Sequence, residues 1–181
     1  VSALARRLQA AKTLSRHEAS TPEKPVQLSG FARGLASRVL SEHAPGTLTL
    51  VLANTVARAR AVHEALTRQA SGTGAPELLL VHSRYRSYER EQLTARLTGA
   101  VDPSGPGLIA TTTQVVEAGV DISARLLVTE LAPWASLVQR FGRVNRAGEF
   151  AGSRVLWVDV PDRLVAPYDV ESLQAAREVL Q

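Results

Sequence analysis

The sequence predicts an α/β fold in which helices cover both faces of a parallel β-sheet. Short apolar segments of strand composition alternate with longer segments of helical periodicity along most of the chain. Strands and helices that alternate at this spacing form β–α–β units, whose strands lie parallel in one sheet. A length of 181 residues suits one such domain.

Five segments have the composition of buried strands. They are rich in Leu, Val, Ile and Thr, and most are apolar without alternation, as expected of strands covered on both faces. The expected strands cover residues 47–54, 77–83, 108–113, 125–133 and 153–160.

Four segments between and after these strands have helical features. Asn54 or Thr55 caps the first helix, Pro133 lies near the start of the third, and Asp169 caps the last. The expected helices cover residues 55–70, 85–97 and 134–144 and the segment after Asp169. Residues 1–25, which are polar and end in STPEKP, predict a helix plus linker that enters the domain of residues 26–181.

The composition restricts the class of protein and of partner. The net charge of +4 and the pI of about 10.1 favour an anionic partner. The positive charge is almost all arginine, which the codon bias of a GC-rich genome explains as well as function does. The chain has no cysteine, which excludes disulfides and cysteine metal sites. Its four histidines are isolated in sequence, so we expect no metal site, and no apolar run approaches the ~20 residues of a membrane helix. The start at Val1 without methionine predicts a fragment of a longer chain.

Polar or glycine-bearing segments follow four of the predicted strands. They are ANT, HSRYR, TTTQVVEAGVD and QRFGRVNR. In open parallel sheets, binding and catalytic sites lie at the carboxyl ends of the strands. We therefore expect all four segments at one edge of the sheet.

The segment of residues 111–123 has the composition of a phosphate-binding loop. Threonine hydroxyls and backbone N–H groups at a strand end bind phosphate, and Gly119 permits a close approach. Asp121 offers a carboxylate for a ribose hydroxyl or an arginine. The alternative is an ordinary turn with a cap and a tight bend.

The arginine-rich segment of residues 139–148 predicts a triphosphate contact. Arg143 and Arg146 are three residues apart, so on a helix they project together, with Gln139 one turn before them. Two guanidinium groups side by side repel unless an anion lies between them, and each matches phosphate oxygens in two-point contact. The alternative is a solvated basic face paired with Glu130 and Glu149.

Residues 47–149 resemble, in order and spacing, motifs IV, IVa, V and VI of superfamily 2 helicases. The residues that carry the resemblance are TLVLANTVARARAVHEAL, LLLVHSRYRSYERE, IATTTQVVEAGVDIS and SLVQRFGRVNRAGE. The pattern TQVVE, a gap, D, and then QRxGRxxR is most similar to the second RecA-like domain of the CRISPR-associated helicase–nuclease. Asn145, where many helicases have glycine, and Gln139, where DEAD-box RNA helicases usually have histidine, favour that branch.

The resemblance implies a RecA-like sheet and the C-terminal motor domain of an ATP-dependent, single-stranded-DNA helicase or translocase. It implies that Arg143 and Arg146 are arginine fingers for the γ-phosphate of ATP and that Gln139 senses the nucleotide. Gly119 and Asp121 would contact the nucleotide. The residues implied to contact the nucleic acid are Thr113 and, less directly, Thr55, His82, Ser83 and Arg84.

The chain lacks the other half of such a motor. It contains no GxxxxGK[ST] phosphate loop, no D-E-x-[DH] segment for Mg²⁺ and no histidine cluster of a nuclease. We expect ATP and Mg²⁺ to be held mainly by a first RecA-like domain, and the chain alone to be inactive. The resemblance further implies a cytoplasmic bacterial or archaeal protein that meets single-stranded DNA and a CRISPR effector complex, without a membrane partner. The alternatives are another superfamily 2 helicase, acting on RNA or in DNA repair, and a non-catalytic docking module.

Overall fold

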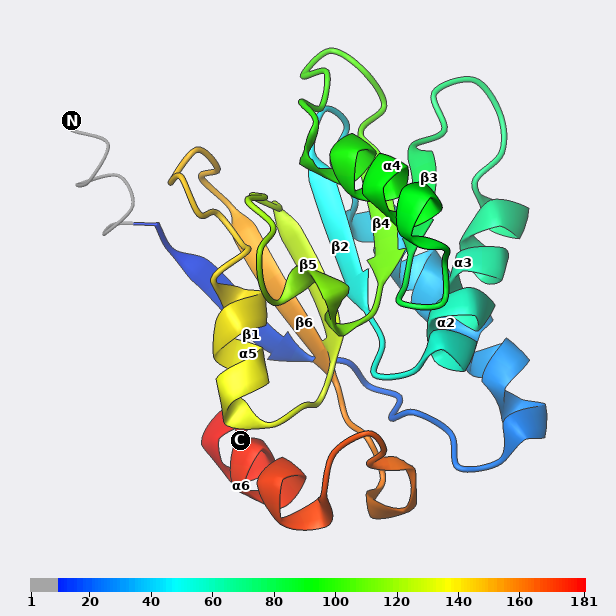
Figure 1. Cartoon of the computed structure of the whole chain (residues 1–181), viewed down its shortest axis with the longest axis vertical. Coiled ribbons are helices and arrows are strands. Elements are labelled where there is room, and N and C mark those ends of the chain that lie inside the picture. The colour runs from blue at the N-terminus through cyan, green and yellow to red at the C-terminus, as the bar shows by residue number, and fades with distance from the viewer. Residues whose placement is uncertain (1–9) are drawn as a thin grey trace.

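The computed structural model describes residues 10–181, which form a six-stranded sheet (Figure 1). Every pair of neighbouring strands is parallel, and the strand order is β1-β6-β5-β2-β4-β3. The strands are β1 (Lys12–Arg16), β2 (Leu48–Leu52), β3 (Glu77–Val81), β4 (Leu108–Thr112), β5 (Leu126–Glu130) and β6 (Ser153–Val158).

Helices cover both faces of this sheet, as predicted. In β2, Leu48, Leu50 and Leu52 belong to the apolar cluster under α4, whereas Val51 belongs to the cluster under α2 and α3. The last helix, α6, packs beside α5 against Trp157. The helices are α2 (Leu28–Glu42), α3 (Val56–Gln69), α4 (Ser87–Thr98), α5 (Trp134–Phe141) and α6 (Val170–Leu180), with single 3₁₀ turns at η1 (Pro25–Gln27), η2 (Gln114–Val116) and η3 (Asp162–Leu164).

The five predicted strands and four predicted helices are all present, and two of the predicted caps are confirmed. The Thr55 hydroxyl accepts a hydrogen bond from the Arg58 N–H at 3.3 Å, and the Asp169 carboxylate accepts one from the Ser172 N–H at 2.7 Å. These bonds satisfy N–H groups that have no partner within the first helical turn.

Three features of the fold differ from the prediction. Residues 12–16 form the edge strand β1, which pairs with β6, and are not part of a helix plus linker; residues 1–9 lie outside the described residues. Helix α2 is absent from the predicted elements, because Gly30 and Gly34 interrupt an otherwise helical spacing of buried residues. Helix α5 ends at Phe141 rather than at residue 144. Within residues 10–181, no helix is both long and apolar enough to cross a membrane.

Candidate nucleotide and nucleic-acid interface

The end of the arginine-rich segment, residues 143–148, lies away from the carboxyl ends of β2, β3 and β4, beside the later part of the loop between β4 and β5. Helix α5 starts beyond the carboxyl end of β5 and runs back along the sheet, so that Val144 forms a parallel bridge with Ala124, before the start of β5. The prediction that all four segments share one edge is therefore wrong for residues 143–148. The other three do follow the carboxyl ends of β2, β3 and β4 (Figure 1).

Arg143 is buried, with a relative exposure of 8%. Its guanidinium donates hydrogen bonds to the carbonyl oxygens of Glu117, at 2.9 Å, and Val120. Its Nε has no partner among the described residues. Arg143 therefore ties the turn after α5 to the loop between β4 and β5.

Arg146 is the exposed arginine of this segment. Its Nε lies 3.0 Å from Asp121 Oδ1, and its backbone N–H donates to the Ser123 hydroxyl at 2.8 Å. The side chains are 46% exposed for Arg146 and 88% exposed for Asp121. A pair this exposed contributes at most about 1 kcal/mol, so the guanidinium can leave Asp121 for an anion at little cost.

The two arginines do not project together, which corrects the prediction. Both follow the end of α5, and Asn145 between them has a left-handed backbone with φ of 49°. Asparagine tolerates this region, and its side chain donates to Phe150 O at 2.8 Å and accepts from Phe150 N at 2.9 Å. Lys12 Nζ donates to the carbonyls of Phe141 at 2.7 Å and Val144 at 3.0 Å. These contacts hold Arg143 inward and Arg146 outward.

The loop between β4 and β5 leaves open space at Gly119. Its φ is +72°, and a Cβ there would meet no atom within 4 Å. The glycine is therefore required by the backbone conformation and not by crowding. Gln139 is exposed on α5, and Thr113, at the start of η2, is 2% exposed.

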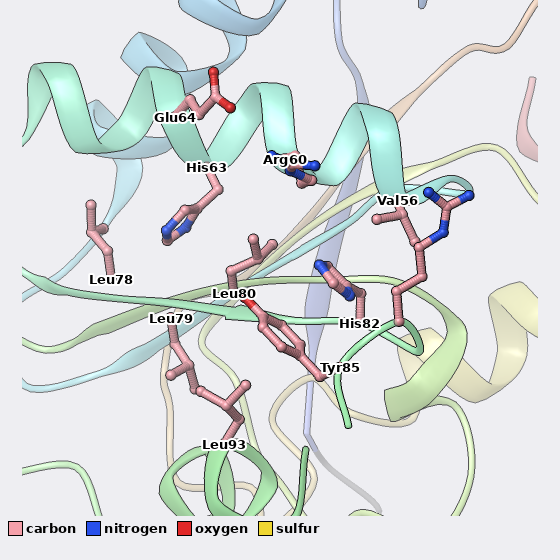
Figure 2. Close-up of a pocket in the computed structure, with 11 residues that line it drawn as sticks. Val56, Arg60, His63, Glu64, Leu78, Leu79, Leu80, His82, Tyr85 and Leu93 are labelled. Atoms are coloured by element: carbon pink, nitrogen blue, oxygen red, sulfur yellow. The ribbon is translucent and has the colours of Figure 1, made fainter. Parts of the chain in front are cut away.

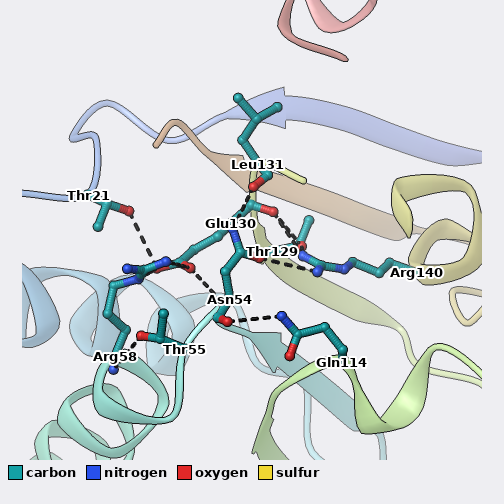
Figure 3. Close-up of polar contacts among 9 residues, drawn as sticks. All are labelled: Thr21, Asn54, Thr55, Arg58, Gln114, Thr129, Glu130, Leu131 and Arg140. Carbon is teal, nitrogen blue, oxygen red and sulfur yellow. Dashed lines mark hydrogen bonds and ion pairs between the residues drawn. The ribbon is translucent and has the colours of Figure 1, made fainter. Parts of the chain in front are cut away.

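A buried polar network, which was not predicted, joins α5 to the strand ends (Figure 3). Its centre is Arg140, with 1% exposure, whose guanidinium has a hydrogen-bond acceptor for each of its five N–H donors. The acceptors are the Glu117 carboxylate, the Thr129 hydroxyl, Glu130 O, Asn54 Oδ1 and the Tyr168 hydroxyl, at 2.8–3.2 Å.

Asn54 is the second junction of this network. Its side-chain amide donates to Leu131 O at 2.7 Å, and its backbone carbonyl accepts from Gln114 Nε2 at 2.9 Å. Its backbone N–H donates to Glu130, which also forms a two-point ion pair with Arg58 at 2.6 and 2.9 Å. The end of β2 is thereby fixed to the loop after β4 and to the end of β5. The sequence feature that could have indicated this network is Glu130, a carboxylate at the end of an otherwise apolar strand.

The remaining predicted site residues lie at the carboxyl ends of β2 and β3. The hydroxyl of Thr55 is used as a helix cap, while Ser83 and Arg84 are exposed. His82 is buried, and its ring stacks on Tyr85 at 4.2 Å with an interplanar angle of 8°. Among residues 10–181, no group of three His, Asp or Glu side chains could hold a metal ion.

Comparison with known families gives the identity of this arrangement. Residues 45–149 match the family model described as CRISPR-associated nuclease/helicase Cas3, C-terminal. This match spans more than half of the chain and contains every residue from the start of β2 to the end of the arginine-rich segment. The chain belongs to the Cas3 C-terminal helicase-domain family. The predicted resemblance is confirmed.

Two curated relatives show how much of a Cas3 protein the chain represents. It is 38% identical over 112 residues to the CRISPR-associated nuclease/helicase Cas3 of Myxococcus xanthus, covering 62% of this chain and 14% of the relative. It is 33% identical over 138 residues to the CRISPR-associated helicase Cas3 of Thermoproteus tenax, covering 75% of this chain and 22% of the relative. The chain thus spans less than a quarter of the length of each.

Solved structures agree on the fold. The crystal structure of T. fusca Cas3-AMPPNP is similar with a TM-score of 0.64 and 27% identity, over 94% of this chain and 21% of that one. A chain of a CRISPR RNA-guided surveillance complex in a pre-nicking state has a TM-score of 0.62 and 22% identity, over 94% of this chain and 22% of that one. The RecA-like α/β fold predicted from the sequence is confirmed.

Proposed function

We propose that this Cas3-family domain is the C-terminal motor half of an ATP-dependent, single-stranded-DNA translocase or helicase that acts in CRISPR antiviral defence. The observation that carries the proposal is the coupling of the motif V loop, residues 113–123, to the arginine-rich segment. Three successive arginines of that segment, Arg140, Arg143 and Arg146, each contact this loop. A movement of the loop on nucleic acid would therefore move the arginines.

In this proposal ATP and Mg²⁺ are held mainly by a first RecA-like domain, and this chain completes the site. Arg146 approaches the γ-phosphate when the two domains close, because its guanidinium is exposed and weakly paired. Arg143, as placed here, holds the carbonyls of Glu117 and Val120 and so positions the loop that contains Gly119 and Asp121. Gln139, which is exposed on α5, is proposed to sense the bound nucleotide.

ATP with Mg²⁺ would supply a phosphoryl group whose transition state spreads negative charge over its oxygens. An arginine that meets this charge only in the closed state lowers the barrier without tightening the open state. When the domains open, Arg146 would return to Asp121. The exposed ion pair is thus a resting position for the finger.

The nucleic acid is proposed to pass the carboxyl ends of β2, β3 and β4. Ser83 and Arg84 are exposed there and offer a hydroxyl and a guanidinium to phosphates. Thr113 and Thr55 would contribute through the backbone at the ends of their strands, and His82 lies behind them. A CRISPR RNA-guided complex is the proposed source of the opened DNA strand.

The chain alone is expected to bind single-stranded DNA weakly and with little sequence preference, because it offers only one half of the track. Affinity should fall as salt rises, with a slope of log K against log salt of about −0.7 for each phosphate contact. Fluorescence anisotropy across a salt series measures this slope. Micromolar or tighter binding that ignores salt would contradict the proposed track.

A further inference from the structure

A cavity of about 650 Å³ lies along the outer edge of β3, between α3 and α4 (Figure 2). β3 is the last strand of the sheet, so no described strand covers this edge. Leu78 and Leu80 line the cavity toward α3, and Leu79 packs with Leu93 of α4 on the other side. The walls along β3 are therefore apolar, and polar residues line the cavity at the carboxyl end of β3.

Two imidazole rings, those of His63 and His82, line this cavity. His82 is 7% exposed, and its Nδ1 has no hydrogen-bond partner among residues 10–181. The buried Nδ1 of His63, on α3, is also unpaired within that range. Burial lowers the pKa of both rings, and Arg60 and Arg84 lower that of His82 further. Each ring is therefore neutral near pH 7 and offers one donor and one acceptor.

The mouth of the cavity is cationic and aromatic. Arg60 and Arg84 line it and are both exposed, whereas Glu64 is the only acidic residue among the lining side chains. Tyr85 forms a parallel stack with His82 at the same end. An anionic group at the mouth and a flat ring with polar edge atoms inside would match these features.

We infer that this cavity binds a nucleobase of the single strand that passes the carboxyl ends of β2, β3 and β4. The inference rests on the proposed function, since it adds a base site to the phosphate track. A base has a planar apolar face for the leucines and Tyr85, and edge heteroatoms for the imidazole rings of His63 and His82. The backbone phosphates next to that base would lie near Arg60 and Arg84.

The observations favour a base over a peptide that extends the sheet. A peptide strand would make its main contacts with the backbone of β3, and these contacts do not involve the imidazole rings of His63 and His82 that line the cavity. The cavity also adjoins the track directly, because His82 and Arg84 belong to both, and Val56 in its wall follows Thr55.

The test compares an ordinary single strand with an abasic strand of the same length, by fluorescence anisotropy at one salt concentration. The chain should bind the ordinary strand about tenfold more tightly, the contribution of roughly one bound base. Tyr85→Ala, which removes part of the wall, and His63→Trp, which fills the cavity, should bring this ratio close to one without changing the affinity for the abasic strand. Tyr88→Ala, which removes a tyrosine that is 70% exposed and does not line the cavity, should leave the ratio unchanged.

The binding data distinguish a base site from a peptide site, and both from a failure of the proposed function. Equal, salt-dependent binding of the two strands by the unchanged chain would overturn the base site and leave the proposed function standing. Binding of neither strand would overturn the proposed function itself. Competition by an acidic peptide that His63→Trp abolishes, while the base-dependent ratio survives, would assign the cavity to a peptide. Should His63→Trp unfold the chain, the comparison of Tyr85→Ala with Tyr88→Ala decides alone.

Discussion

Changing Arg146 to alanine, in a protein that joins this domain to a first RecA-like domain, is expected to lower DNA-stimulated ATP turnover by a factor of roughly 10³–10⁵. The guanidinium would meet charge that develops only in the transition state, so the rate should fall far more than ATP binding. Stability should change by less than about 1 kcal/mol, because the pair with Asp121 is exposed. Steady-state turnover and urea unfolding measure the two quantities.

Two further variants separate a finger from a structural arginine. Arg163→Ala removes another exposed arginine of an ion pair, 3.5 Å from Glu23, and should leave turnover unchanged. Arg143→Lys should lower turnover and also stability, because an ammonium cannot reproduce the two-point contact of Arg143 with two carbonyls. Turnover of Arg146→Ala within a few fold of the parent would leave Arg146 as an ordinary surface charge.

Replacing Arg140 with alanine is expected to lower the free energy of unfolding of the chain by about 3–5 kcal/mol. The change leaves the Glu117 carboxylate without its guanidinium and removes the hydrogen bonds to Asn54 and Thr129. A buried charge or amide that loses its partner retains its cost of desolvation. Arg140→Lys should recover only part of the lost stability. A lysine has fewer N–H donors than an arginine, and it cannot place them in the planar arrangement of a guanidinium.

The matched control is Arg68→Ala, because Arg68 forms an exposed ion pair with Glu64 at 3.4 Å on α3. That variant should cost no more than about 0.5 kcal/mol. Urea unfolding followed by circular dichroism measures all three variants. If Arg140→Ala lost no more stability than Arg68→Ala, the network in Figure 3 would not hold the strand ends together.

The central strands and their helices could be predicted because their signals are local. Strands β2, β4 and β5 are buried along their whole length and appear as apolar runs. β1 could not be predicted in the same way. Its sequence, KTLSR, is polar and largely exposed, and it becomes a strand only by pairing with β6, more than a hundred residues later.

The geometry around the arginine-rich segment could not be predicted from the sequence. The sequence does not show that Arg140, in the last turn of α5, is buried while Arg146, after the helix, is exposed. The difference arises from where α5 ends and from the left-handed backbone at Asn145. The partners of Arg140 come from four segments distant in sequence, so only the assembled sheet brings them together.

The loop after β4 contacts both the end of β2 and the arginine-rich segment. Gln114 contacts the end of β2, Glu117 contacts Arg140, and Asp121 contacts Arg146. One short loop therefore touches the end of the proposed DNA track, the buried network and the proposed finger. This continuity gives a physical route by which bound DNA could change the position of Arg146.

The most direct test of the half-motor proposal is the rate of ATP hydrolysis, with single-stranded DNA present, by the chain alone and by the chain joined to a first RecA-like domain. We expect no turnover by the chain alone, because its sequence contains no phosphate-loop motif. We expect DNA-stimulated turnover by the joined protein that Arg146→Ala abolishes. Steady turnover by the purified chain alone, or turnover of the joined protein that Arg146→Ala leaves unchanged, would contradict the half-motor proposal.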